Sequence, residues 1–342
     1  MSRIAIIGLG LIGGSIGLAL RRAEPKDTEV VGFDRDAQVA SRAQHAGAVS
    51  SVAPTLDHAV RGATMVLIAT PIISVRKVFS EIAPHLQPNT LVTDTASTKQ
   101  DVLRWAGETL PRHAHFVGGH PMAGKEQSGP QAAEAGLFDG RPYCLVPSLD
   151  AGPGAVSAMV GFAEALGAKP FFLDAAEHDA YAAAISHVPL VASLALFGLA
   201  RGSNAWPELA NLAGPAFRDL TRLASGEPEM AHDIFRTNRT NVVHWLERYI
   251  AELRRIADLI EGDDSEGLFR LLAETQLERD NFLVNLPKRE EPYSNAELPT
   301  PAQAFLNMTI GNWHERTREL TDAMEERQRE RQREERLHRR ED

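Results

Sequence analysis

The feature that most constrains the fold is the glycine-rich segment "RIAIIGLGLIGGSIGLAL" near the N-terminus. Gly8, Gly10 and Gly13 have the GxGxxG spacing, after a run typical of a strand and at the start of a stretch typical of a helix. In such a unit the first glycine permits a tight turn, the second lets the backbone approach a pyrophosphate, and the third allows close packing of helix on strand. The segment therefore predicts a dinucleotide-binding unit. Its five glycines and the following "RR" fit a signal peptide poorly.

The acidic residue at the end of the next predicted strand supports this interpretation. That strand, "EVVGFD", ends at Asp34, where a carboxylate accepts hydrogen bonds from both ribose hydroxyls of a dinucleotide. The same carboxylate repels a 2′-phosphate, so the sequence favours NAD over NADP, although the adjacent Arg35 has the charge to bind that phosphate. The residues expected to contact the cofactor are Gly8, Gly10, Leu11, Ile12, Gly13, Asp34, Arg35, Thr70 and Pro71. We expect no metal ion.

The composition limits the partners of the chain. Acidic residues outnumber basic ones by 46 to 36 among 342 residues. Nucleic acids and anionic membranes attract basic surfaces, so we expect neither as a partner. The single Cys144 excludes an intrachain disulfide and fits a reducing compartment, so we expect a cytoplasmic protein. Its place in the apolar run "YCLVP" favours a buried strand cysteine over a catalytic thiol.

Two structural patterns divide the chain. In the first half, short β-rich runs alternate with helical segments, which predicts parallel strands, right-handed crossovers and helices on both faces of a sheet. We expect an α/β Rossmann-type doubly wound parallel sheet over residues 1–174 and an all-α domain over 175–288. In the second domain, apolar residues at three- and four-residue spacing predict one helix from about Pro228 to Ile260 and another at about 264–284. So long a helix exceeds the needs of a small domain and favours a homodimer.

Two further segments have alternative interpretations. The run "AAAISHVPLVASLALFGLA" (182–200) is long and apolar, but His187, Pro189 and Ser193 interrupt it. The interruptions favour a helix buried between subunits or domains over a membrane span. Residues 289–342 form a charged extension in which arginines and acidic residues nearly balance at its end. This pattern predicts a solvated helix or a disordered tail rather than an arm that binds nucleic acid.

His120 is the strongest candidate for a catalytic group. It lies in "FVGGHPMAG", after an apolar run and between glycines and a proline, so a stiff loop fixes its position. In doubly wound sheets the ligand lies beyond the carboxyl ends of the strands, where "VTDTASTKQ" brings Ser97 and Lys99 to the same region. An unperturbed imidazole titrates near neutral pH, which suits accepting a hydroxyl proton while a hydride leaves the same carbon. This group of residues predicts a dehydrogenase; a histidine that only caps a turn is the structural alternative.

Five segments of the chain together resemble one enzyme family. "GLGLIGGSIGLAL", "DTASTK", "GGHPMAGKEQSG", "ISHVP" and "FRDLTRLASGEPEM", in this order, are similar to the prephenate/arogenate dehydrogenases of tyrosine biosynthesis. The resemblance extends over about residues 3–285, and "HPMAG" with the following "SG" is its most specific part. It implies a Rossmann domain followed by a helical dimerisation domain. It also implies NAD(P)-dependent oxidative decarboxylation of prephenate to 4-hydroxyphenylpyruvate, or of arogenate to tyrosine. For this chain it favours a homodimeric, NAD-dependent prephenate dehydrogenase.

The resemblance also implies roles for individual residues. His120 corresponds to the histidine that draws the proton from the ring hydroxyl as hydride passes to NAD. Ser97 corresponds to the serine that bonds both this hydroxyl and the histidine. Arg222 corresponds to the arginine that holds a carboxylate of the dicarboxylate substrate, a task that suits the planar fork of a guanidinium. The other residues implied at the substrate site are Glu126, a gating acid, Asp219, a neighbour of the arginine, and His187, the first histidine of the usual "SHLPH".

The chain departs from the family pattern at two positions of the expected substrate domain. Leu190 replaces the second histidine of "SHLPH", and Ala231 replaces the bulky aromatic residue often found after "PxM". Arg218 is the nearest alternative to Arg222 as the carboxylate-binding arginine. The sequence therefore leaves the choice between prephenate and arogenate open.

Two other functions are compatible with parts of the sequence. β-Hydroxyacid dehydrogenases and imine reductases share the architecture of a Rossmann domain plus helices, but usually rely on a lysine or aspartate of the helical domain. An NAD-responsive binding protein would leave Ser97, His120 and Arg222 without a purpose. The dehydrogenase of prephenate accounts for more of the sequence than either.

Overall fold

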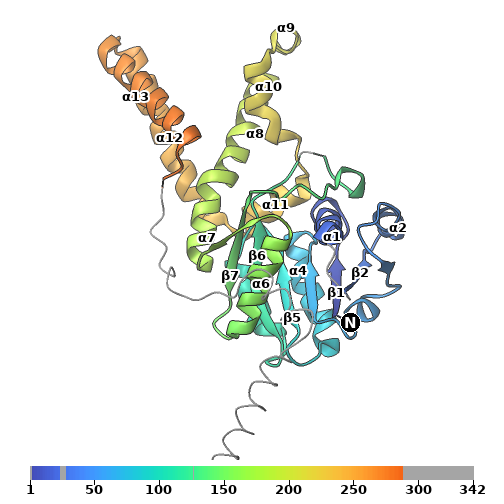
Figure 1. The fold of residues 1–342 in the computed structure, drawn as a ribbon. Helices are drawn as coiled ribbons and strands as arrows, with labels where there is room; N and C mark the ends of the chain where they lie inside the picture. The colour runs from blue at the N-terminus through green and yellow to red at the C-terminus, as the bar shows by residue number, and fades with distance from the viewer. Residues whose placement is uncertain (1, 24–27, 126, 288–342) are drawn as a thin grey trace, which may run out of the picture. The chain divides into compact units, whose positions relative to one another are not determined.

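The computed structural model describes residues 2–23, 28–125 and 127–287, and these form two compact units (Figure 1). The first unit ends at Ala175 and the second begins at Ala176. Two predictions lie outside the described residues: the charged extension over 289–342 and the gating acid Glu126.

The first unit is built on a sheet of eight strands in the order β3-β2-β1-β4-β5-β6-β7-β8. All neighbouring strands are parallel except the antiparallel pair β6 and β7. The predicted doubly wound, mainly parallel sheet is thus confirmed. The strands are β1 (Ser2–Ile7), β2 (Thr28–Phe33), β3 (Ser51–Val52), β4 (Met65–Ile68), β5 (Leu91–Asp94), β6 (His115–Pro121), β7 (Pro142–Pro147) and β8 (Lys169–Phe172).

The antiparallel pair was not predicted, and the connection between its strands explains it. A parallel return needs a crossover, usually an α-helix. Between β6 and β7 the described residues contain only the short 3-10 helix η2 (Pro130–Ala132), so the chain returns beside β6 in the opposite direction. The register pairs His120 with Cys144. The two-residue strand β3 was also missed, because it is too short to produce an apolar pattern.

Helices cover both faces of this sheet. Helices α1 and α6 pack on each other and, with Ile4, Ile6, Met65 and Leu67 of the sheet, enclose the larger apolar core. Helices α3, α4 and α5 pack side by side in a separate group. The helices of the first unit are α1 (Leu11–Ala23), α2 (Ala37–His45), α3 (Leu56–Val60), α4 (Ile72–Ile82), α5 (Gln100–Thr109) and α6 (Pro153–Ala165), with the 3-10 helix η1 (Ala83–His85).

The strand order creates a switch point between β1 and β4. From there the chain winds toward β2 and β3 on one side and toward β5 and β6 on the other. Because these strands are parallel, their carboxyl ends share one edge of the sheet, where ligands of such folds bind. The loops after β1, β2, β4 and β5 and the end of β6 all lie at this edge. They carry every cofactor and catalytic residue that the sequence predicted.

The second unit is helical. It contains α7 (Ala175–Ala182), the π-helix η3 (Ala183–His187), α8 (Val188–Arg201), α9 (Trp206–Leu212), α10 (Pro215–Thr221), the 3-10 helix η4 (Arg222–Ser225), α11 (Pro228–Thr237), α12 (Arg239–Glu261) and α13 (Ser265–Val284). Only Ala175, the first residue of α7, belongs to the first unit, and the rest of the helix belongs to the second. The helix predicted at about 264–284 is confirmed as α13.

The prediction of a single helix from Pro228 to Ile260 is wrong. Helix α11 ends at Thr237, α12 begins at Arg239, and the intervening Asn238 has φ −124° and ψ 28°, outside the helical region. The Thr237 hydroxyl donates to the carbonyl of Asp233, 2.8 Å away, and the buried side chain of Asn238 bonds to other helices. The tertiary bonds of Asn238 override an apolar periodicity that continues across the break.

One helical stretch among the described residues, Ala175–Arg201, has the length and composition of a membrane span. It runs for 27 residues with a mean hydropathy of 1.8, and a third of its most apolar part (33%) is buried within the chain. A single stretch of this kind is weak evidence for a membrane, because core and interface helices pass the same test. Ile185, Leu194 and Leu199 are exposed on it. The surface of this stretch is therefore largely apolar.

Candidate active site

The loop after β1 has the geometry of a dinucleotide-binding turn. Gly8 adopts φ +91°, and a Cβ there would lie 2.5 Å from the carbonyl oxygen of Ala69, so only glycine fits. A Cβ at Gly13 would collide with the carbonyl oxygen of Gly8, so the first turn of α1 packs directly on the loop. A Cβ at Gly10 would meet nothing within 4 Å. The loop is therefore closed on the protein side and open at Gly10, beside the N-terminus of α1, where a pyrophosphate fits.

Asp34, immediately after β2, is held by the same loop. One carboxylate oxygen accepts from the backbone N–H of Leu9 at 2.8 Å, and the other from the N–H of Asp36 at 2.9 Å. These two bonds fix the carboxylate and leave its remaining lone pairs for ribose hydroxyls. Arg35 is exposed, so its side chain takes no part in this arrangement of bonds.

The other predicted cofactor residues lie at the same edge. Leu11 and Ile12 are half-buried in the first turn of α1, and Thr70 and Pro71 follow β4 directly, with Pro71 as the N-cap of α4. With the glycine loop and the anchored Asp34, these residues fit a bound NAD. The fit depends on the backbone of the loop and on one carboxylate, both of which are already in place.

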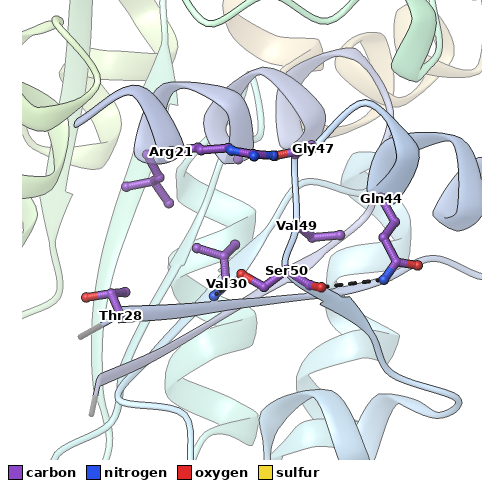
Figure 2. Close-up of a pocket in the computed structure, with 10 residues that line it drawn as sticks. Arg21, Thr28, Val30, Gln44, Gly47, Val49 and Ser50 are labelled. Carbon is purple, nitrogen blue, oxygen red and sulfur yellow. Dashed lines mark hydrogen bonds between the residues drawn. The ribbon is translucent and has the colours of Figure 1, made fainter. Parts of the chain in front are cut away.

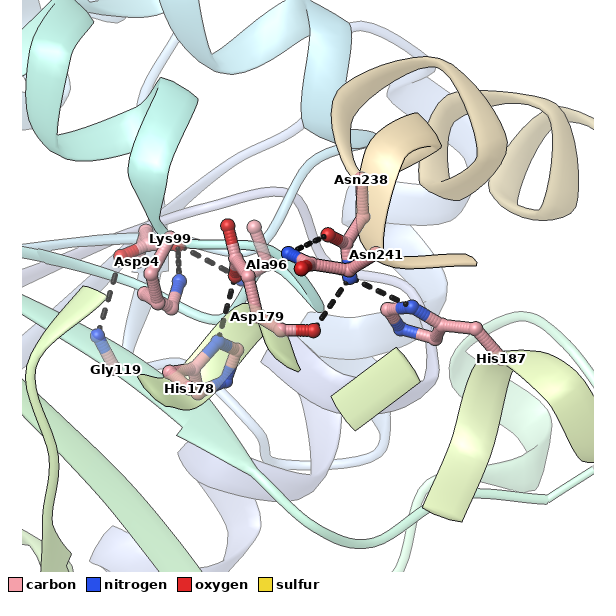
Figure 3. Close-up of polar contacts among 9 residues, drawn as sticks. All are labelled: Asp94, Ala96, Lys99, Gly119, His178, Asp179, His187, Asn238 and Asn241. Carbon is pink, nitrogen blue, oxygen red and sulfur yellow. Dashed lines mark hydrogen bonds and ion pairs between the residues drawn. The ribbon is translucent and has the colours of Figure 1, made fainter. Parts of the chain in front are cut away.

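A buried ion pair lies at the end of β5 and in the loop that follows it (Figure 3). The ammonium of Lys99 pairs with Oδ2 of Asp94, and both side chains are fully buried. The same oxygen accepts from the N–H of Ala96 at 2.9 Å, while Oδ1 accepts from the N–H of Gly119 at 3.1 Å. Asp94 thus ties the loop after β5 to β6. Lys99, which the sequence placed near the nicotinamide, has its ammonium in this buried pair.

This carboxylate positions both predicted catalytic residues. Ser97 lies half-buried in the loop between Ala96 and Lys99, the two residues that Asp94 holds. His120 follows Gly119 in β6 and is 8% exposed. A Cβ at Gly119 would lie 2.6 Å from the carbonyl oxygen of Asp94, so glycine at this position permits the close approach of the two strands. The prediction of a stiff loop at His120 is wrong, because the residue lies within strand β6 and pairs with Cys144. Its fixed position results from strand packing.

Cys144, the neighbour of His120 in the sheet, is a buried strand residue, as predicted. It is 5% exposed, and burial raises the pKa of its thiol to about 11. A thiol with this pKa carries little thiolate at neutral pH and makes a poor nucleophile. The preference for a structural cysteine over a catalytic one is confirmed.

The predicted carboxylate-binding residues lie together in the second unit. Arg222 is the first residue of η4, and its backbone N–H bonds the carbonyl of Asp219, one turn earlier in α10. Arg222, Asp219 and the alternative Arg218 are all exposed. The buried hydroxyl of Ser193 on α8 accepts from the N–H of Ala224 at 3.1 Å and so anchors η4. The sequence marked Ser193 only as an interruption of an apolar run.

His187 lies in a buried polar cluster of the second unit (Figure 3). Its Nδ1 lies 3.2 Å from the side-chain nitrogen of Asn238, which also donates to the carbonyl of Asp179 at 2.7 Å. Nearby, Nδ1 of His178 lies 2.8 Å from the carboxylate of Asp179. All four side chains are at most 3% exposed. Burial lowers the pKa of His187 to about 4, so its imidazole is neutral at pH 7.

A cavity of the first unit lies away from this edge (Figure 2). It has a volume of about 600 Å³ and is lined by residues such as Arg21, Thr28 and Ser50. Thr28 begins β2, whereas Asp34 follows its end, so the cavity lies at the amino end of that strand. The dinucleotide loop and His120 are not among its lining residues.

Three supporting residues were not recognised from the sequence as parts of the site: Asp94, Asp179 and Asn238. Asp94 had a usable signal, since an acidic residue ends a buried strand in "LVTD" just before the predicted loop. Asp179 and Asn238 had none, because their bonds connect residues 59 apart in the chain.

The chain matches one family over both units. Residues 16–171 match the family "Prephenate dehydrogenase, nucleotide-binding domain", and residues 174–274 match "Prephenate dehydrogenase, dimerization domain". Prephenate dehydrogenase of Bacillus subtilis (strain 168) is 34% identical over 290 residues, which cover 84% of this chain and 77% of that protein.

Two solved structures show the same similarity. The arogenate dehydrogenase of Synechocystis aligns with a TM-score of 0.69 and 31% identity, covering 82% of this chain and 99% of the other. The prephenate dehydrogenase of A. aeolicus, solved with hydroxyphenyl propionate and NAD+, aligns with a TM-score of 0.76 and 26% identity, covering 82% and 98%. The similarity therefore extends over both units, and one of the two similar structures contains the cofactor that the loop after β1 fits.

Proposed function

The chain belongs to the prephenate dehydrogenase family, and on that basis we propose that it converts prephenate to 4-hydroxyphenylpyruvate by NAD-dependent oxidative decarboxylation. The observation that carries the proposal is the shared edge of the sheet. There the glycine loop, the anchored Asp34 and the buried His120 lie at the carboxyl ends of β1, β2 and β6 of one sheet. This arrangement suits a reaction in which a hydride and a hydroxyl proton leave the same carbon.

His120 is the general base of the proposed reaction. It accepts the proton of the hydroxyl at ring C4, and Ser97 donates or accepts hydrogen bonds to keep hydroxyl and imidazole aligned. NAD, when bound, takes the hydride from C4. Asp94 contributes indirectly, since it holds the loop of Ser97 and the residue before His120 in one fixed arrangement. Such a preset arrangement lowers the entropic cost of alignment in the transition state.

The decarboxylation requires little further help from the protein. Oxidation at C4 produces a dienone whose carbonyl is conjugated to the carbon that bears the ring carboxylate. The electron pair of the bond to that carboxylate flows through the ring to the carbonyl oxygen as carbon dioxide leaves. The ring becomes aromatic, and His120 returns its proton to the phenolate oxygen. The products are 4-hydroxyphenylpyruvate, carbon dioxide and NADH.

We expect Arg222→Ala to raise the KM for prephenate by about 10- to 100-fold with a smaller change in kcat. The reason is that a guanidinium bonding a carboxylate contributes to binding in the ground state and the transition state alike. Arg222→Lys should recover only part of the loss, since an ammonium lacks the planar fork. Steady-state kinetics with saturating NAD measure KM and kcat for both variants.

Arg218→Ala, one turn away on α10, is the matched control for this variant and should leave KM close to that of the wild type. An unchanged KM in Arg222→Ala, or an equal increase in Arg218→Ala, would remove Arg222 from the carboxylate site.

We propose that Asp34 makes the enzyme prefer NAD over NADP. Asp34→Ser is expected to raise the KM for NAD by about 10- to 100-fold, since the bonds to the ribose hydroxyls are lost. It should also raise kcat/KM with NADP, because the repulsion of the 2′-phosphate disappears while Arg35 remains. Kinetics with both cofactors at saturating prephenate test this.

The neighbouring variant Asp36→Ser is the control. Asp36 caps α2 by accepting from the N–H groups of Gln38 and Val39, and serine also caps helices well. This variant should keep the wild-type cofactor preference. If Asp36→Ser shifts the preference as much as Asp34→Ser does, the effect is a general one of charge and Asp34 has no special role.

We propose that the protein is a cytoplasmic homodimer that associates through the second unit. The match to the family's dimerization domain supports the assembly. Apolar side chains exposed on α8, α12 and α13 of the single chain, such as Leu199, Leu253 and Phe269, would be covered by a second copy. The apolar stretch Ala175–Arg201 is then an interface helix rather than a membrane span.

An assay of two substrates with two cofactors tests the proposal as a whole. Prephenate and arogenate are each supplied with NAD and with NADP, while reduced cofactor and carbon dioxide are followed together. The proposed function predicts the highest kcat/KM for prephenate with NAD. A higher kcat/KM for arogenate would assign the chain to the arogenate branch of the family, to which the Synechocystis structure belongs. Reduction without carbon dioxide release would point to a different reaction.

A further inference from the structure

Three segments of the second unit meet at His187 through buried polar groups. Asp179 is on α7, His187 ends the π-helix η3, and Asn238 precedes α12. Their side chains are fully buried or, for Asn238, 3% exposed. Buried polar groups are retained only where their bonds are satisfied or serve a ligand. Each bond in this cluster therefore has to be accounted for.

The orientation of the Asn238 amide follows from its partners. The carbonyl of Asp179, 2.7 Å away, only accepts, so the group that faces it is the NH₂ of Asn238. On the other side, the NH₂ of Asn241 donates to Oδ1 of Asn238 at 2.8 Å. The carbonyl of Asp179 determines the assignment of nitrogen and oxygen, and the contact with Asn241 agrees with it.

This orientation selects the tautomer of His187. The second N–H of Asn238 points to Nδ1 of His187 at 3.2 Å, so Nδ1 carries a lone pair. The neutral imidazole then has its proton on Nε2. Burial keeps the ring neutral at pH 7. His187 therefore presents one N–H donor, at Nε2.

That donor has no partner among the residues that the structure describes. Nε2 is inaccessible to solvent and makes no hydrogen bond there. An unsatisfied buried donor is costly, and native structures keep one where a ligand or an ordered water completes it. The π-turn has a local cause, because the ring of Pro189 would clash with the carbonyl of Ile185 in a regular α-helix. Such turns are frequent at functional sites.

We propose that Asn238, held in turn by Asn241, is a positioning residue that fixes His187 as the Nε2–H tautomer. The buried Nε2–H then donates to a carboxylate or carbonyl oxygen of the bound substrate. The inference rests on the proposed function in taking His187 as a substrate contact. It adds which nitrogen of His187 is protonated, which atom donates to the substrate, and the two asparagines that determine this tautomer and this donor.

The first test observes the tautomer directly. Protein labelled with ¹⁵N in histidine is examined by long-range ¹H–¹⁵N NMR, and the His187 signals are assigned by their loss in His187→Gln. We expect a protonated Nε2 and an unprotonated Nδ1 in the wild type, and a mixture of tautomers in Asn238→Leu and, to a lesser degree, in Asn241→Leu. A wild-type ring protonated at Nδ1, or an unchanged tautomer in Asn238→Leu, would overturn the inference.

The second test asks whether a ligand accepts from Nε2. Saturating NAD and hydroxyphenyl propionate, the ligands of the A. aeolicus structure, should shift the Nε2–H resonance of His187. Asn211→Asp, a change in an exposed asparagine of α9, serves as the control and should respond like the wild type. An Nε2–H signal that does not respond to saturating ligand would mean that a buried water is the acceptor, against the proposal.

The third test replaces the donor while keeping the shape. The amide nitrogen of glutamine can reach the place of Nε2, whereas that of asparagine reaches only the place of Nδ1. His187→Gln should therefore stay within about threefold of the wild-type KM for prephenate, and His187→Asn should raise it by about 10-fold or more with a smaller change in kcat. Equal KM values for the two variants would refute a specific role for the Nε2 donor.

These outcomes are separate from those of the proposed function. If the wild type turns over neither prephenate nor arogenate, the proposed function fails, and the NMR tests still decide the tautomer and its response to ligand. If the wild type is active and His187→Asn leaves KM unchanged, the proposed function stands and this inference fails.

Discussion

His120→Asn is expected to fold and to bind NAD like the wild type, and to turn over prephenate about 10²- to 10⁴-fold more slowly, the usual contribution of a positioned general base. Asparagine keeps a hydrogen-bonding group near the hydroxyl but cannot take its proton at neutral pH. The side chain is 8% exposed and lies in the strand that Asp94 holds, so a substitution of similar shape should leave the backbone in place. Stopped-flow and steady-state measurements of NADH formation give the loss in kcat.

The matched control is His58→Asn. His58 is exposed on α3, and its carbonyl bonds Arg3 near the start of β1, far from the carboxyl ends of the strands. This variant should retain wild-type kcat. Turnover within about threefold of the wild type in His120→Asn would take His120 out of the mechanism and leave only a dinucleotide-binding fold with an unidentified base.

Asp94→Ala is expected to destabilise the first unit by about 3–5 kcal/mol, because it leaves the buried ammonium of Lys99 without its partner. It also leaves the N–H groups of Ala96 and Gly119 without their acceptor. The backbone beside Ser97 and His120 is then no longer held, so the folded fraction of the variant should lose most of its kcat. Chemical denaturation monitored by fluorescence measures the free energy of unfolding. The kinetics are then taken below the unfolding transition.

A double variant separates the two effects of this substitution. Asp94→Leu combined with Lys99→Met removes both charges, so it should regain much of the stability but little of the activity, since the two N–H groups remain without an acceptor. Asp101→Ala removes a partly exposed carboxylate of α5 that pairs with Arg104, and should change neither property appreciably. Full activity in the double variant would show that Asp94 has no positioning role.

The sequence predicted those parts of the fold that depend on local patterns. Alternating β-rich and helical runs predicted the parallel strands β1, β2, β4, β5 and β6. The spacing of Gly8, Gly10 and Gly13 predicted the loop that the structure shows closed against Ala69. Such features are set by residues a few positions apart, which is why one sequence suffices to identify them.

Features that depend on distant residues were missed or predicted incorrectly. The apolar pattern continues across Asn238, but the helix breaks there, because the side-chain amide forms bonds with residues that are remote in the chain. The antiparallel direction of β7 follows from the absence of a crossover helix among the described residues between β6 and β7. It does not follow from the residues of β7 itself. The buried pair of Lys99 with Asp94 was not predicted, since only the fold shows which carboxylate its ammonium meets.

The predicted site residues differ in how far the structure constrains them. Ser97 and His120 are fixed by backbone that is itself held by a buried carboxylate, and Asp34 by two N–H groups. Arg222 and Asp219 are exposed on a short helical segment that Ser193 anchors. The predicted catalytic residues are therefore held in place within the single chain, whereas the predicted carboxylate-binding residues are exposed at its surface.

Isotope transfer tests the central claim most directly. Prephenate that carries deuterium at ring C4 is supplied to the wild-type enzyme with NAD, and the reduced cofactor and carbon dioxide are measured by mass spectrometry. The account predicts that each carbon dioxide is accompanied by one reduced NAD carrying the deuterium, and that His120→Asn slows both products equally. Carbon dioxide released without deuterated NADH, or NADH formed without the label, would contradict it.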